Sequence, residues 1–63
     1  MISSLKRVRI LQDKTQYDLM LKTGIHQTIL SHFENGYKKP TEKQKKLLAR
    51  ALKVKVEEIF PKE

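Results

Sequence analysis

Four polar side chains near the middle of the sequence have the types and spacing needed to form hydrogen bonds with the edges of nucleic-acid bases. They lie between Gly24 and Gly36, on one side of a short helical pattern. These side chains are Gln27, Thr28, Ser31 and His32. A face that served only solubility would usually carry Lys and Glu, whereas amides and hydroxyls pair with base edges. An ordinary amphipathic surface helix also carries such residues, so this segment alone leaves that alternative open.

Each of the four has its own possible contact with DNA. The Gln27 amide can pair with adenine N6 and N7, and Thr28 offers a hydroxyl and a methyl group suited to thymine. Ser31 could bind through water or could bond its own helix backbone instead. His32 could reach a purine N7 or a phosphate, or it could simply be a surface residue. Because this face lacks arginine, we do not expect a guanine-rich core site.

Residues for catalysis or metal binding are poorly placed. His26 and His32 are six residues apart, not the four that would place two metal ligands on one helical face. Ser31 beside His32 points to a different side of the helix, so the two do not form a nucleophile–base pair. The absence of cysteine excludes disulfides and thiolate metal sites. No Gly-rich phosphate loop is present. We therefore expect no enzyme activity, no cofactor and no metal.

Length and charge limit the class of protein. With 63 residues, the chain is expected to form one domain over residues 1–63 with a small core. The 14 basic against 7 acidic residues give +7, which favours nucleic acid first and an anionic membrane second. The basic residues are spread over several helical segments, unlike those of a membrane-surface helix. The sequence shows neither a membrane span nor a signal peptide, so we expect a cytoplasmic protein.

The elements that must position the polar face are all helical. A first helix is predicted from about Ser4 to Gln12, after Ser3 or Ser4 as cap, and a second follows the capping box Thr15–Asp18. Gly24 ends the second helix, and the third follows at once. The side chains expected to face inward are Leu5, Val8, Leu11, Tyr17, Leu19, Met20, Ile25, Ile29, Leu30 and Phe33.

The second half of the chain continues the all-α pattern. A basic loop over 36–40 precedes a second capping box, Thr41–Gln44, which opens a fourth helix. Its expected core residues are Leu47, Leu48, Ala51 and Leu52, and its basic outer face is expected to be mostly solvated. A last short turn covers 57–60.

The order of these pieces resembles the Cro/lambdoid-repressor (XRE-type) helix-turn-helix DNA-binding domain over nearly the whole chain. The pieces are Thr15-Gln16-x-x-Leu19, Gly24-Ile25, Glu34-Asn35-Gly36, Pro40 and Ala51-Leu52-x-Val54. Each motif is weak alone, but their joint order and spacing are specific. The resemblance implies an all-α, compact five-helix bundle with its helix-turn-helix at about 15–35 and its third helix in the major groove.

The resemblance also implies roles for particular residues. In the family, the outer face of the third helix contacts the bases, which here implies Gln27, Thr28, Ser31 and His32. Phosphate contacts are expected from Thr15, Gln16, Asn35, Tyr37, Lys38, Lys39 and Lys43. Arg9 and Glu34 are expected to form a structural ion pair. The alternative for the glutamines and loop lysines is that they are plain solvated polar residues.

Four positions depart from the family's pattern. Met20 stands where alanine is preferred, and Lys14 where an apolar loop residue is common. His26 replaces the usual capping Ser or Thr, so we expect a weaker start of the third helix. Lys53 replaces a glycine, so a left-handed turn there would cost roughly 1–2 kcal/mol.

These features together predict a DNA-binding transcriptional regulator, most simply a repressor, which binds a two-fold operator as a homodimer. The expected dimer patch is Val56, Ile59 and Phe60, although these apolar residues could equally close the protomer's own core. The alternative function is an antitoxin or other protein-binding module of the same fold, in which DNA binding is secondary.

Overall fold

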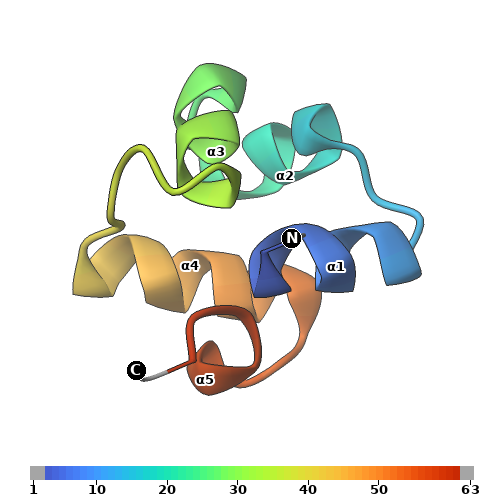
Figure 1. The fold of residues 1–63 in the computed structure, drawn as a ribbon. Coiled ribbons are helices and arrows are strands. Elements are labelled where there is room, and N and C mark those ends of the chain that lie inside the picture. Colours follow the sequence, from blue (N-terminus) through green and yellow to red (C-terminus); the bar gives the residue numbers. More distant parts are fainter. Residues whose placement is uncertain (1–2, 62–63) are drawn as a thin grey trace.

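Two short helices stand above two others, with a fifth beneath them. The computed structural model describes residues 3–61. The helices are α1 (Ser4–Leu11), α2 (Gln16–Thr23), α3 (Gln27–Glu34), α4 (Glu42–Leu52) and α5 (Val56–Ile59). In Figure 1, α2 and α3 form the upper layer over α1 and α4, and α5 lies below α4. The predicted all-α, five-helix fold with a helix-turn-helix is therefore confirmed.

Side-chain caps begin the helices where the sequence predicted them. The Ser3 hydroxyl accepts from the Lys6 amide at 3.1 Å. Both predicted capping boxes form, one at Thr15 with Asp18 and one at Thr41 with Gln44. In each box the side chain of the third helical residue accepts the N–H of the cap residue, so two unpaired donors are satisfied at once.

The ends of α2 and α4 both use a left-handed residue. Gly24 has φ of 76°, which glycine adopts without strain, and its amide donates to the Met20 carbonyl. Lys53 adopts the same region with φ of 57°, as the departure from the family pattern implied. The end of α4 thus carries a backbone strain that the end of α2 avoids.

One core joins the helices. It contains Leu5, Leu19, Ile25, Leu30, Phe33, Leu48, Ala49, Leu52 and Ile59. Two residues expected inside are instead exposed: Leu11 at 77% and Tyr17 at 52%. Leu11 lies six residues after Leu5, a rotation about 120° away from it on a helix, and Tyr17 lies nearly opposite Leu19. Gln12, the C-cap of α1, is also exposed, but its amide donates to the Leu52 carbonyl at 2.8 Å and so ties the end of α1 to the end of α4.

The C-terminal helix closes the protomer's own core. Ile59, one of the three residues expected at a dimer patch, is only 2% exposed and belongs to the protomer's own core, the alternative that the sequence left open. Val56 and Phe60 pack against the core but stay partly exposed. No helix within residues 3–61 has the length and apolar character needed to cross a membrane.

Candidate nucleic-acid interface

The polar face of α3 is open to solvent. Gln27 and Thr28 are exposed, and Ser31 and His32 are half-buried. With Gln16 and His26, these four line one shallow open hollow. On the opposite side of α3, Leu30 and Phe33 are buried in the core, which fixes the rotation of the helix. The four side chains predicted to contact bases therefore share one accessible surface.

The start of α3 is capped by an unusual residue. The His26 imidazole accepts a hydrogen bond at Nδ1 from the Thr28 amide, over 3.1 Å. His26 therefore satisfies this amide although Ser or Thr is usual here, so the expected weakening of the helix start would not come from a missing cap. The preceding turn is also fixed, because the Thr23 hydroxyl donates to the Leu19 carbonyl and accepts from the Ile25 amide.

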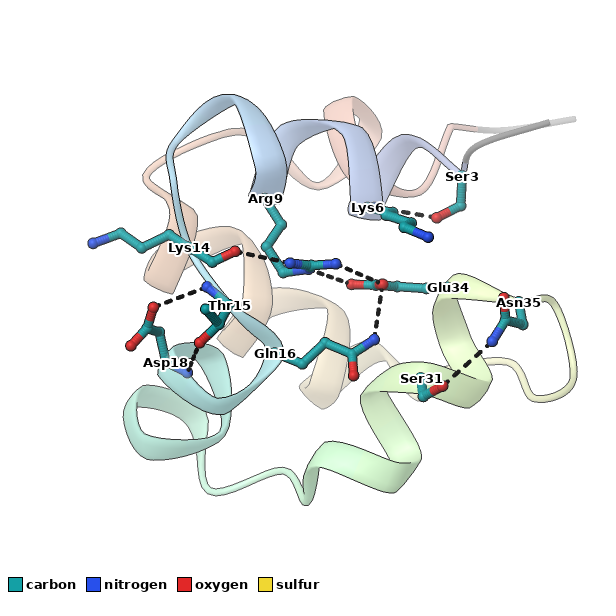
Figure 2. Close-up of polar contacts among 10 residues, drawn as sticks. All are labelled: Ser3, Lys6, Arg9, Lys14, Thr15, Gln16, Asp18, Ser31, Glu34 and Asn35. Atoms are coloured by element: carbon teal, nitrogen blue, oxygen red, sulfur yellow. Dashed lines mark hydrogen bonds and ion pairs between the residues drawn. The ribbon is translucent and has the colours of Figure 1, made fainter.

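A buried ion pair holds α3 against α1. Arg9 Nε lies 2.7 Å from Glu34 Oε2, and Arg9 Nη2 donates to Glu34 Oε1 at 3.1 Å. The two side chains are 11% and 2% exposed. Arg9 also donates to the Lys14 carbonyl, as Figure 2 shows. The ion pair expected from sequence is therefore present. Both charged side chains have hydrogen-bond partners at a site that water reaches poorly.

Gln16 joins the same network. Its amide Nε2 donates to Glu34 Oε1 at 3.0 Å, drawn as the lower dashed line to Glu34 in Figure 2. One N–H of Gln16 is therefore used inside the protein, while the other N–H and the carbonyl remain for other partners. No sequence pattern predicts this contact, because residues 16 and 34 belong to different helices and their proximity depends on packing.

The loop after α3 carries polar and basic residues, two of which contact the polar face of that helix. Asn35, Tyr37, Lys38 and Lys39 are all exposed. The Tyr37 ring meets His32 edge-on, with centroids 6.0 Å apart, and its backbone N–H donates to the His32 carbonyl. Asn35 Nδ2 donates to Ser31 Oγ at 3.3 Å. Tyr37 and Asn35 were expected to contact phosphates. They also contact His32 and Ser31, which were expected to contact bases.

The remaining expected phosphate residues lie at helix starts. Thr15 caps α2 and is exposed, and Lys43 is exposed in the first turn of α4. Hydrogen bonds from the Thr15 backbone N–H and hydroxyl hold the pKa of Asp18 below its usual value. The Asp18 charge therefore stabilises the start of α2, where the helix dipole favours a negative group.

No metal site is evident in the part of the chain that the structure describes. Within residues 3–61, no three His, Cys, Asp or Glu side chains gather as metal ligands would. The open hollow on α3 is shallow and polar, unlike the enclosed apolar pockets that hold cofactors. The hydrogen-bond donors and acceptors that line this hollow suit a partner with an extended polar surface.

Comparison with known proteins agrees with this geometry. Residues 5–59, most of the chain, match the model of a family described as helix-turn-helix. This match confirms the family that the sequence resembled. No curated protein and no solved structure gives a significant match.

Proposed function

The chain belongs to the helix-turn-helix family of DNA-binding regulators, and we propose that it is a repressor that recognises a specific duplex sequence. In this proposal α3 enters the major groove of an operator half-site. Gln27, Thr28, Ser31 and His32 contact base edges, and the flanking groups hold phosphates. The observation that carries the proposal is the single open face formed by these four side chains on a helix seated in the core.

The electrostatics support the same proposal. The formal charge is +7; Lys38 and Lys39 are exposed in the loop that follows α3, and Lys43 is exposed in the first turn of α4. Such groups would neutralise phosphates on both sides of a groove, while the polar face between them reads the sequence. The amide groups at the start of α2 add a partial positive charge that favours phosphate.

We further propose that residues 1–63 act as one domain and that two copies bind a two-fold operator. Half-sites would then lie about 34 Å apart, one helical turn of DNA. Val56 and Phe60 remain our candidates for the dimer contact, since both are partly exposed and apolar. An intracellular location follows from the proposed partner.

Selection from random duplexes tests the function directly. The protein would be incubated with a random duplex library at a stated salt concentration, and bound duplexes would be amplified and sequenced. We expect enrichment of one short motif, repeated as a palindrome if the dimer proposal is right. Equal binding to selected duplex and random competitor would refute sequence-specific recognition.

A further inference from the structure

Asn35 and Ser31 form a polar unit at the C-terminal end of the proposed recognition face. Asn35 Nδ2 donates to Ser31 Oγ over 3.3 Å, across one turn of α3. Figure 2 draws this bond separately from those that join Glu34 to Arg9 and Gln16. Ser31 lines the open hollow together with Gln27 and Thr28, whereas Asn35 is exposed beside it.

This hydrogen bond changes what the Ser31 hydroxyl offers to a partner. A serine hydroxyl has one proton and two lone pairs. Because the Asn35 amide occupies one lone pair, the proton of Ser31 must point away from Asn35. Accepting a bond also makes the hydroxyl a better donor, since successive hydrogen bonds polarise one another. Ser31 therefore presents chiefly its proton to the open side of α3.

We infer that Asn35 is a specificity-determining positioning residue, which turns the Ser31 hydroxyl so that it donates to an acceptor atom on a base. The acceptors within the major groove are purine N7, guanine O6 and thymine O4. The inference rests on the proposed function, because it requires α3 to enter that groove. It gives Asn35 a second role beside the phosphate contact expected from sequence.

A competing arrangement is a bond from Ser31 to its own helix backbone. Helical serines commonly donate to the carbonyl four residues earlier, which here belongs to Gln27. Among the hydrogen bonds formed within residues 3–61, the Ser31 hydroxyl has the Asn35 amide as partner and makes no such backbone bond. Its proton is therefore available to a base.

Base analogues test the inference once selection has given a preferred duplex. Ser31→Ala first identifies the base pair at which the preference is lost. At that pair, 7-deazapurine removes N7, 2-aminopurine removes guanine O6, and 5-methyl-2-pyrimidinone removes thymine O4. We expect one of these analogues to weaken binding of the unmodified protein about 3- to 10-fold, the effect of one neutral hydrogen bond. The Ser31→Ala protein should bind the natural duplex and the same analogue duplex with equal affinity.

Variants of Asn35 then test its positioning role. In Asn35→Asp the carboxylate only accepts, so the Ser31 proton turns toward it and a lone pair faces the base. Asn35→Leu removes the bond without adding charge. For each variant, we take the ratio of its affinities for the natural and the analogue duplex, so that a loss of affinity for both duplexes alike cancels. We expect this ratio to fall toward one. Melting temperatures check that both variants fold.

Three outcomes would overturn the inference. One is a Ser31→Ala protein that keeps every base preference. Another is an unmodified protein that loses affinity when purine replaces adenine at the Ser31-dependent pair, which removes an amino donor instead of an acceptor. The third is an unchanged affinity ratio in both Asn35 variants. Failure of the proposed function differs from all three, because no preferred duplex would then emerge, and the inference would fall with it.

Discussion

The side-chain amide of Gln16 donates to Glu34 Oε1 over 3.0 Å, which ties the first residue of α2 to the last residue of α3. The same carboxylate accepts two bonds from Arg9 in α1. Glu34 is therefore the point at which three helices meet. Because α2 and α3 form the helix-turn-helix, the shape of the proposed DNA-binding surface depends on one buried carboxylate.

Replacement of Glu34 by alanine should strongly destabilise the protein. The change leaves the Arg9 guanidinium, 11% exposed, without its partner. Breaking a buried ion pair in this way costs about 3–5 kcal/mol. For a domain of this size, the melting temperature should fall by more than about 10 °C in thermal unfolding followed by circular dichroism.

Glu42→Ala is the matched control for this prediction. Glu42 pairs with Lys45 at 3.5 Å, but its side chain is 81% exposed. Exposed pairs of this kind contribute about 0–1 kcal/mol, so the melting temperature should change little. Equal shifts for the two variants would contradict a structural role for the buried pair.

Gln27→Ala should reduce affinity for the selected duplex and relax one base position. The exposed Gln27 amide can form two bonds to adenine, and loss of such a contact costs about 1–3 kcal/mol. Competition binding against duplexes changed at single positions measures both effects. If affinity fell equally on selected and random duplexes, Gln27 would not be reading a base.

Lys38→Ala should weaken binding to all duplexes alike. Lys38 is exposed in the loop beside α3, where a phosphate contact would release one counterion on binding. The slope of log affinity against log salt should therefore become shallower by about one unit. Lys55→Ala is the control, since Lys55 is exposed and precedes α5, a helix that lies across the α1 and α4 layer from α3 in Figure 1. A slope that responds equally to both changes would count against a local contact.

Lys53→Gly should stabilise the fold. Lys53 has φ of 57°, a conformation that costs an ordinary residue roughly 1–2 kcal/mol and glycine almost nothing. We expect the melting temperature to rise by several degrees. Lys46→Gly, at an exposed position inside α4, should instead lower stability by about 1 kcal/mol. A loss of stability in both variants would show that the strain at Lys53 is already relieved.

The contribution of Asp18 to the stability of α2 should be lost at low pH. The pKa of Asp18 is lowered from 3.8 by hydrogen bonds from Thr15, so the charged carboxylate is favoured in the folded state. Its contribution is present above the unfolded pKa and is lost as the pH falls through the folded pKa. The difference in melting temperature between the natural protein and Asp18→Asn should therefore shrink below about pH 3.8. A pH-independent difference would assign the effect to something other than this charge.

Local sequence signals predicted much of the fold because their physics is local. The capping boxes at Thr15 and Thr41 involve residues three positions apart, so their hydrogen bonds form wherever the helix forms. Gly24 likewise marks its own turn. Periodicity predicted α1 less well. Residues spaced by three do not stay on one face of a helix with 3.6 residues per turn, so Leu11 is exposed although Leu5 is buried.

The helical order, the family and the polar composition of the face on α3 could all be predicted from the residues alone, since these depend on neighbours in the chain. The packed structure was needed to show that Ile59 belongs to the protomer's own core, that His26 caps α3, and that Gln16 shares the Glu34 carboxylate. The Ile59 and Gln16 placements depend on how distant helices pack. The His26 bond depends on how the turn before α3 orients the ring, and no spacing along a sequence encodes either.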